Sequence, residues 1–245
     1  MAWFEAEEFW REFFTVLFPP WRSSEAQLQV NQIITLTGFQ GESVLDLCCG
    51  PGYHAAAFAR RGFKVTGVDL SGYLLDLARD ETSKLGFAIK WIREDMRNFC
   101  AMEAFDLVCN LTTSIGYFDD EADNLSVLRN VYASLRPGGI FLIDTTGKEI
   151  IARKWQAAFC TENADGSTLI RHCRIRDDWS RIHNEWILLK DTDVRKFSYE
   201  HHIYSGSELK EKLLQSGFGR VQLYGDLEGS PYGLEAARLI AIAKK

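Results

Sequence analysis

An acid and two glycines follow one another at a spacing that suits ligand binding. Asp46 closes a short apolar run, and Gly50 and Gly52 come shortly after it. Because glycine has no side chain, the backbone at these two positions can approach a bound molecule closely. A helical pattern begins at Tyr53, and the free amide groups at the start of a helix favour polar or anionic groups. The segment therefore indicates a binding loop between a strand and a helix.

Polar residues also stand at the ends of the next three apolar runs. Asp69 ends the second run, Asp95 follows the third, and Asn110 ends the fourth. In an open parallel sheet, ligands bind beyond the carboxyl ends of the strands, beside the first strand. These residues are therefore expected to converge with Asp46 on one crevice. A carboxylate at the position of Asp69 can accept hydrogen bonds from both hydroxyls of an adenosine ribose.

The elements that must position these residues alternate between strands and helices. Runs of strand type lie at residues 43–47, 64–69, 88–92, 105–110, 140–143, 220–224 and 238–243. Helical patterns follow the first, second and fourth of these runs, which is typical of βαβ units and a parallel sheet. The runs are continuously apolar, as expected when helices cover both faces of the sheet. The sequence therefore predicts the α/β fold class, with a doubly wound, seven-stranded, mostly parallel sheet.

The N-terminal part of the chain carries a surplus of aromatic residues. Residues 2–18 read as one amphipathic helix that two prolines stop, and two adjacent serines then cap a second helix. The aromatic stripe fits either packing against the body of the protein or a lid over the site. Trp21 and Arg22, directly after the prolines, are the residues expected to reach the site. We take residues 1–38 as the N-terminal helical lid.

A second segment that does not follow the alternation of strands and helices lies between residues 150 and 205. Three runs of alternating polar character, at 168–176, 181–189 and 194–204, are separated by turns rich in aspartate. This pattern predicts an antiparallel β meander inserted into the α/β sequence. We therefore expect a single domain over residues 1–245, with an inserted β subdomain at residues 150–205.

The composition argues against several classes of protein. The net charge of −6 argues against a nucleic-acid surface or an anionic membrane partner. No run approaches the ~18 apolar residues of a transmembrane helix. The six cysteines form no Cys-x-x-Cys pattern, which predicts reduced thiols in a cytoplasmic protein. No acidic cluster has the spacing of metal ligands, so no metal site is expected.

Two classes of cofactor fit the loop at residues 50–55. Its sequence Gly-Pro-Gly-Tyr-His-Ala satisfies the loose dinucleotide pattern G-x-G-x-x-A, with Asp69 as the ribose acid. An NAD(P)-dependent oxidoreductase is one function consistent with this loop. That interpretation leaves Asp46, Asp95 and the Arg-Pro-Gly-Gly segment at 136–139 unexplained.

The clusters at the strand ends resemble the motifs of class I S-adenosylmethionine-dependent methyltransferases. The segment 46–52 resembles the first motif of that family, 68–71 its ribose-binding acid, 94–97 its adenine-binding segment, and 135–139 the approach to its fifth strand. The resemblance is strong over residues 42–146 and continues more weakly to the C-terminus. It implies a Rossmann-like methyltransferase fold, S-adenosylmethionine as cofactor, and a single methyltransferase domain.

The resemblance also implies which residues hold the methionine part of the cofactor. These are Asp46 and the backbone around Cys48, Gly50 and Gly52, with Leu111 beside the methionine moiety. The family more often has glycine at the position of Cys48, and a small side chain there should leave the backbone contact intact.

The nucleoside part of the cofactor has its own implied residues. Asp69 would bind the ribose, while Leu70 would pack on the adenine. Asp95 would accept a hydrogen bond from the adenine amino group, and Met96 would pack near the ring.

The motifs constrain the methyl acceptor less than the cofactor. Residues 113–117 and the β insertion are similar to those of small-molecule N-methyltransferases that act on amino sugars. In those enzymes the insertion helps to form the acceptor pocket and often a dimer contact, and Tyr117 would line that pocket. Period-two alternation places Tyr199 and His201 on the more apolar face of their strand, so both are predicted to face inward. His201 is the candidate catalytic base.

Arginines of the insertion leave two readings open. Arg171, Arg174 and Arg176 fit a clamp on an acidic acceptor, although cross-strand ion pairs are the commoner role of such arginines. We include Arg171 among the predicted acceptor residues.

The sequence thus predicts methyl transfer from S-adenosylmethionine to a small-molecule acceptor, at nitrogen rather than oxygen or carbon. A homodimer through the β insertion is a further expectation, with neither a membrane nor a nucleic acid as partner. The alternatives are an RNA-modifying methyltransferase, an NAD(P)-dependent oxidoreductase, and a protein that binds the cofactor without turnover.

Overall fold

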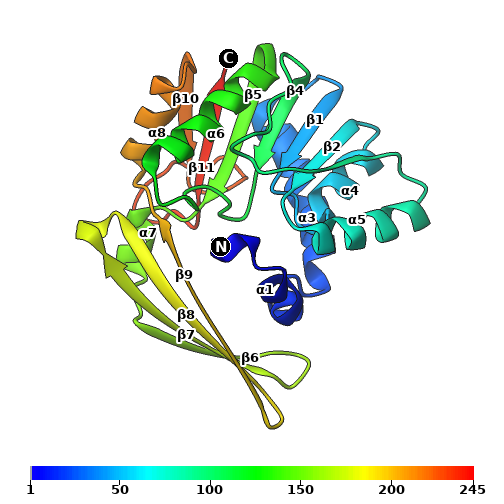
Figure 1. Ribbon diagram of the computed structural model, residues 1–245. Coiled ribbons are helices and arrows are strands. Elements are labelled where there is room, and N and C mark those ends of the chain that lie inside the picture. The colour runs from blue at the N-terminus through cyan, green and yellow to red at the C-terminus, as the bar shows by residue number, and fades with distance from the viewer. Residues whose placement is uncertain (1) are drawn as a thin grey trace.

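The computed structural model describes residues 2–245 and contains two separate sheets (Figure 1). Met1, with which the predicted domain and lid begin, lies outside these residues. The larger sheet has seven strands in the order β10-β11-β5-β4-β1-β2-β3. Their bounds are β1 (Ser43–Leu47), β2 (Lys64–Asp69), β3 (Lys90–Arg93), β4 (Phe105–Asn110), β5 (Leu135–Thr145), β10 (Arg220–Tyr224) and β11 (Leu239–Lys244). Only β11 pairs in antiparallel fashion, with β5 and β10, so the predicted α/β, mostly parallel, doubly wound sheet is confirmed.

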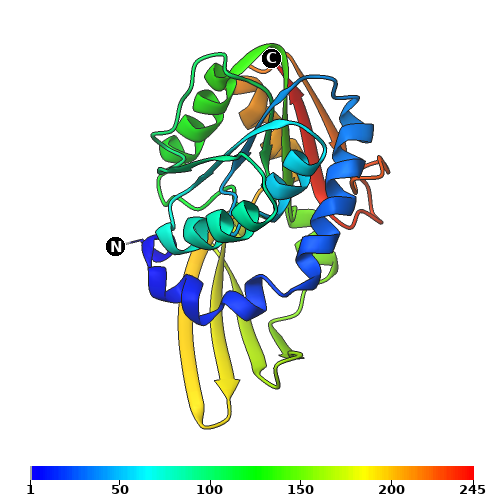
Figure 2. The ribbon, with the colours of Figure 1, turned by 90° about the vertical axis from the view of Figure 1, so that its right-hand side faces the viewer.

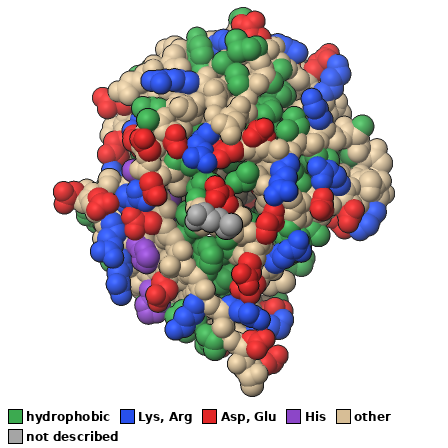
Figure 3. Space-filling model, in the orientation of Figure 1, with side chains coloured by type: hydrophobic (Ala, Val, Ile, Leu, Met, Phe, Trp, Pro, Cys, Tyr) green, Lys and Arg blue, Asp and Glu red, His purple; other side chains and the backbone are tan. Residues whose placement is uncertain are grey.

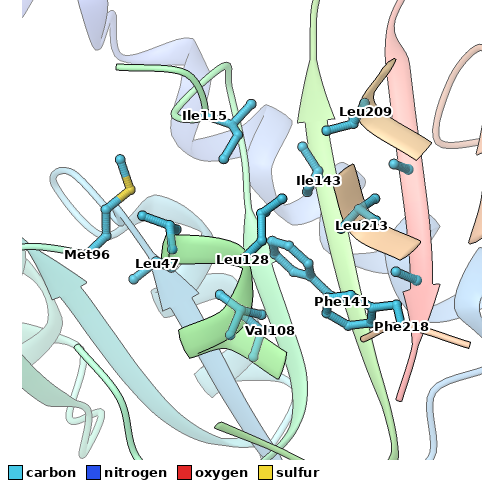
Figure 4. Packing of buried hydrophobic residues seen from close by; sticks show 14 of the residues in the cluster. Leu47, Met96, Val108, Ile115, Leu128, Phe141, Ile143, Leu209, Leu213 and Phe218 are labelled. Atoms are coloured by element: carbon cyan, nitrogen blue, oxygen red, sulfur yellow. The ribbon is translucent and has the colours of Figure 1, made fainter. Parts of the chain in front are cut away.

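Helices cover both faces of this sheet. Val30 of α3 packs with Phe58 of α4 on one face. On the other face, Leu128 of α6 and Leu213 of α8 pack around Phe141 of β5 (Figure 4). Burial on both faces explains why the strands read as continuous apolar runs. The helices of the body are α3 (Trp21–Thr37), α4 (Tyr53–Arg60), α5 (Gly72–Lys84), α6 (Glu121–Ser134), α7 (Lys148–Arg153) and α8 (Gly206–Gln215).

The β insertion forms the second sheet, which is antiparallel and projects away from the first (Figure 1). Its strands are β6 (Ala158–Glu162), β7 (Thr168–Arg176), β8 (Arg181–Lys190) and β9 (Asp193–His202), in that order. A 3-10 turn, η2 (Asp177–Trp179), connects β7 to β8. The predicted meander corresponds to β7, β8 and β9. The edge strand β6 was not predicted, because it is short and its mostly exposed side chains give no clear alternation.

The single helix predicted over residues 2–18 is wrong. The segment consists of η1 (Trp3–Glu5), α1 (Glu7–Glu12) and α2 (Phe14–Leu17). The backbone leaves the helical region at Ala6, where ψ is 96°, and bends again at Phe13, where ψ is 9°. These bends turn Phe9 and Phe13 onto the second sheet, and the Phe9 ring stacks on Phe197 at 4.2 Å between centroids. The segment therefore crosses between the two sheets (Figure 2).

Helix α3 begins earlier than its sequence pattern indicated. It starts at Trp21 after Pro20, so Ser23 and Ser24 lie in its first turn and do not cap it. It ends at Gly38, whose left-handed φ of 61° gives the expected glycine terminus.

The structure also bears on two features of the composition. All six cysteines are free thiols. None of the helices found between residues 2 and 245 combines the length and the apolar character needed to cross a membrane.

The glycine loop after β1 gives a first prediction. Gly52 and Gly62 both have positive φ, 78° and 89°, so alanine is strained at either position. A Cβ on Gly52 would also lie 2.5 Å from the Trp91 ring, whereas a Cβ on Gly62 would meet nothing within 4 Å. We expect Gly52→Ala to lower the free energy of unfolding by about 1–3 kcal/mol more than Gly62→Ala does. Urea denaturation of the ligand-free protein measures the free energy of unfolding of both variants. Equal losses for the two variants would contradict the steric conflict between residue 52 and the Trp91 ring.

Candidate active site

The loops that follow β1, β2, β3 and β4 line one cavity. The chain closes its other side with residues from the N-terminal segment and from α3 and α4, among them Phe18, Arg22 and Tyr53. The strand ends that the sequence pattern singled out therefore lie together. The predicted cofactor residues that line this cavity are Arg22, Asp46, Cys48, Gly50, Asp69, Leu70, Asp95, Met96 and Leu111.

Two predicted cofactor residues, Gly52 and Trp21, do not line this cavity. The missing side chain of Gly52 makes room for Trp91 of β3 rather than for a ligand. Trp21 is 57% exposed in the first turn of α3 and lines a neighbouring cavity.

Asp69 connects the loops after β1 and β2. Its Oδ2 accepts a hydrogen bond from the Gly50 N–H at 2.8 Å, and its Oδ1 accepts one from the Ser71 N–H at 2.9 Å. Burial raises the pKa of Asp69, and these two N–H groups act in the opposite direction. The carboxylate therefore fixes the glycine loop directly beside the end of β2.

Two buried acceptor atoms in this region have no hydrogen-bond partner within residues 2–245. They are Oδ2 of Asp46 on β1 and Oδ1 of Asn110 on the adjacent strand β4. The Asn110 amide donates to the Leu47 carbonyl at 3.2 Å, which directs its oxygen away from that strand. Burial raises the pKa of Asp46 to about 7. Both atoms are acceptors that lack a donor, such as the ammonium group of a ligand would supply. Asp46 lines the first cavity, whereas Asn110 is not among its lining residues.

Asp95 is held in place by a charged neighbour. Its Oδ2 accepts a hydrogen bond from Arg97 Nη2 at 2.6 Å, and its Oδ1 accepts one from the Arg97 backbone N–H at 2.8 Å. Arg97 is fixed in turn by Asp123 at 3.0 Å and by the ring of Phe118, 4.4 Å from its guanidinium carbon. The carboxylate thus has one orientation at the rim of the cavity.

Cys48 occupies a backbone position that favours glycine. Its φ is 61°, in the left-handed region, which explains why glycine suits this position. The Cys48 Sγ lies 3.3 Å from the Met96 Sδ. Burial raises the pKa of the thiol well above its usual value, so it stays protonated and is not a nucleophile.

The N-terminal segment is attached to the body through Glu7. Its carboxylate accepts hydrogen bonds from the Ser71 hydroxyl and the Gly72 N–H, both at 2.8 Å, at the start of α5. A carboxylate at this position also interacts favourably with the helix dipole. Arg11 lies over the Tyr73 ring at 4.1 Å and forms a second attachment to α5.

A second, larger cavity lies against the first, under the β insertion. Both cavities are lined by Trp10, Arg22, Thr112 and Tyr117, which form a shared wall. The far side of the second cavity belongs to the second sheet and includes Trp186. The predicted acceptor residues that line it are Tyr117, Arg171, Tyr199 and His201.

Three ionisable side chains of the second cavity, His201, Tyr117 and Tyr199, are neutral at pH 7. Burial lowers the pKa of His201 to about 4, helped by the charges of His202 and Arg181. The Nδ1 atom of His201 is buried without a partner in the described chain. Burial raises the pKa of Tyr117 and of Tyr199, so both hydroxyls keep their protons.

Sequence reasoning missed three residues of this region. Trp3 lies between Tyr117 and Tyr199, with its ring centroid 4.6 Å from each, and its only signal was the aromatic surplus. Arg97 follows Asp95 by two residues, a spacing that allows a side chain to fold back onto the acid. Glu7 gave no local signal, because its partners are distant in sequence.

Metal ligation finds no support in this part of the molecule. Within residues 2–245, no group of three or more histidine, cysteine or acidic side chains is placed to hold a metal ion.

The raised pKa of Asp46 predicts how stability depends on pH. Its pKa rises from an ordinary 3.8 to about 7 in the native state, so the native protein keeps a proton that the unfolded chain loses above pH 4. This carboxyl therefore lowers the free energy of unfolding as the pH rises from about 4 to about 7. We expect Asp46→Asn to gain stability relative to the wild type over this range, by on the order of 3 kcal/mol at pH 8. Urea unfolding at pH 4.5, 6 and 8 measures the difference in stability between the variant and the wild type. A difference that does not change with pH would contradict the raised pKa of Asp46.

The chain matches a family model over its cofactor-binding region and a known protein over most of its length. A family model described as a methyltransferase domain matches residues 44–139. YqeM of Bacillus subtilis, itself a provisionally assigned methyltransferase, is 27% identical over 82% of this chain and 83% of its own.

Solved structures resemble the whole chain. An S-adenosylmethionine-dependent methyltransferase from Clostridium acetobutylicum superposes with a TM-score of 0.77 at 16% identity, over 97% of both chains. The sugar N-methyltransferase KedS8 from Streptoalloteichus has a TM-score of 0.66 at 24% identity, over 90% of this chain and 86% of its own. Residues 44–139 thus match a methyltransferase domain, and the chain as a whole has the fold of S-adenosylmethionine-dependent methyltransferases.

Proposed function

We propose that the chain transfers a methyl group from S-adenosylmethionine to a nitrogen atom of a small-molecule acceptor. The observation that carries this proposal is the wall shared by the two cavities, formed in part by Thr112 and Tyr117. A cofactor in the first cavity and an acceptor in the second would meet at this wall. Holding two reactants together in this way supplies a large part of the acceleration that such a transfer needs.

The residues of the first cavity fit S-adenosylmethionine. Asp46, with its unpartnered acceptor atom, would receive its ammonium group, and Asn110 on the adjacent strand carries a second unpartnered acceptor behind the cavity wall. Arg22, which lines both cavities, would pair with its carboxylate. Asp69 would hold the ribose, and Asp95 would accept a hydrogen bond from the adenine amino group. When bound, the cofactor supplies a methyl group that a positively charged sulfur has already activated.

An amine suits the second cavity better than an alcohol does. An alcohol must lose its proton to attack, whereas a neutral amine only has to present its lone pair. His201 stays the candidate base, and a pKa of about 4 makes it too weak a base to ionise an alcohol, which again favours an amine. The rings of Trp3, Tyr117 and Tyr199 surround this region and would attract the positive charge that develops on nitrogen. The similarity to a sugar N-methyltransferase supports the same choice.

No specific observation favours the RNA-modifying alternative. Acidic and basic side chains are interspersed on the face drawn in Figure 3, and the net charge is −6. The oxidoreductase alternative is set aside because residues 44–139, which include the glycine loop, match a methyltransferase domain. A homodimer through the β insertion and a cytoplasmic location stay predictions.

We further propose that residues 1–38 act as a lid over both cavities. The described part of this segment contributes Phe4, Trp10 and Phe18 to the wall of the first cavity, and Trp3 and Phe9 to that of the second. A cofactor could then enter or leave only when the attachment at Glu7 opens.

The lid proposal predicts a change in cofactor release. Glu7→Gln weakens the hydrogen bonds to the start of α5, so we expect S-adenosylhomocysteine to dissociate about 3- to 10-fold faster. Glu8→Gln is the matched control, because Glu8 is an exposed carboxylate on the same helix. Stopped-flow tryptophan fluorescence measures the rates. Unchanged release from the Glu7 variant would contradict the lid.

A methyl-transfer assay tests the proposed function directly. Amino sugars and other primary amines are compared with alcohols of the same carbon skeleton, and formation of S-adenosylhomocysteine is measured. We expect turnover with amines and little with the matching alcohols.

The assay includes two aspartate variants. Asp69→Ala should lower cofactor affinity at least tenfold, because it releases the glycine loop and removes a ribose contact. Asp76→Ala, which removes an exposed aspartate on α5, is the control. Transfer to alcohols alone would contradict the choice of nitrogen, and unaltered cofactor affinity of Asp69→Ala would contradict the assigned cofactor site.

A further inference from the structure

Arg171 projects from β7 onto the face of the second sheet that lines the acceptor cavity. The register places it in one cross-strand row with Phe159, Trp186 and Phe197. Its guanidinium carbon lies 5.0 Å from the centre of the Phe159 ring. The positive charge is thus held against an aromatic side wall of the cavity.

This guanidinium has no counter-ion within residues 2–245. Arg171 takes part in none of the ion pairs found there, and its Nε atom is buried without a hydrogen-bond partner. Two other arginines of the insertion do have counter-ions, since Arg181 pairs with Asp119 and Glu200, and Arg195 pairs with Glu12. Arg174 and Arg176 are also without an ion pair within residues 2–245, but they do not line the cavity. The cross-strand ion pairs considered from the sequence therefore do not account for Arg171.

The cavity itself offers little negative charge to balance Arg171. Its acidic lining residues are Glu25 and Asp144, and Asp144 is already paired with Arg238 at 2.6 Å. Tyr199, which lines the same cavity, is a neutral hydroxyl. A guanidinium cannot lose its proton in a protein, and a partly buried one without a partner is unfavourable. A ligand that brings an anion would remove this cost.

We propose that Arg171 binds an anionic group, a carboxylate or a phosphate, of the methyl acceptor. This inference rests on the proposed function, because it takes the second cavity as the acceptor site. The planar guanidinium binds either anion through two parallel hydrogen bonds. Arg171 lines the second cavity but not the first, so the anionic group would lie away from the cofactor. The acceptor would then be held at two points, its amine at the shared wall and its anion at β7.

A titration of the protein saturated with S-adenosylhomocysteine tests this site. The probes are benzoate and phenyl phosphate, with benzyl alcohol as the uncharged match, and Trp186 beside Arg171 reports binding through its fluorescence. We expect at least one anion to bind tenfold or more tightly than benzyl alcohol. The tighter of the two identifies the acceptor group as a carboxylate or a phosphate.

Three variants assign the binding to Arg171. Arg171→Met should reduce anion binding at least tenfold, to the level of benzyl alcohol, and Arg171→Lys should retain part of it. Arg174→Met is the matched control, because Arg174 is exposed on the same strand and does not line the cavity. Thermal melting verifies that each variant is folded.

The possible outcomes distinguish the anion site at Arg171 from the proposed methyltransferase function. Anions that bind no more tightly than benzyl alcohol, or that bind Arg171→Met as they bind the wild type, would overturn the anion site. Calorimetry with S-adenosylhomocysteine on the same samples tests the proposed function separately. A protein that binds this product but no anion would keep the methyltransferase assignment and lose only the role of Arg171.

Discussion

The carboxylate of Asp69 holds the active-site region together. By accepting hydrogen bonds from Gly50 and Ser71, it fixes the glycine loop after β1 against the start of α5. Glu7 binds the same helix start and brings the N-terminal segment over the loop. The order of the parallel strands, with β1 between β4 and β2, makes this arrangement possible. The carboxyl ends of these strands thus position the first cavity and the N-terminal segment that covers it.

Aromatic packing builds the second cavity. Phe9 and Phe13 of the N-terminal segment pack on Trp186 of the insertion, and Trp3 inserts between Tyr117 and Tyr199. Neither the segment nor the insertion could bury these rings alone, so each stabilises the position of the other. The acceptor cavity therefore depends on contacts between parts of the chain that are almost 200 residues apart.

The sequence predicted best where local patterns decide the structure. Apolar runs located the strands of the larger sheet, and acids at their ends located most of the first cavity, because parallel strands bring their carboxyl ends together. Tyr199 and His201 followed from strand alternation. The break in the N-terminal helix at Phe13 did not follow, because contacts with a distant sheet cause it. For the same reason the sequence could not show that Gly52 accommodates Trp91, or that Glu7 binds α5.

A crystal structure of the complex with S-adenosylhomocysteine tests the central claim, that two adjoining cavities hold the cofactor and the acceptor. We expect the amino group of the ligand beside Asp46 and Asn110, its ribose on Asp69, and its sulfur facing the shared wall at Tyr117. A ligand bound outside the first cavity, or with its adenine beside Asp46, would contradict this arrangement.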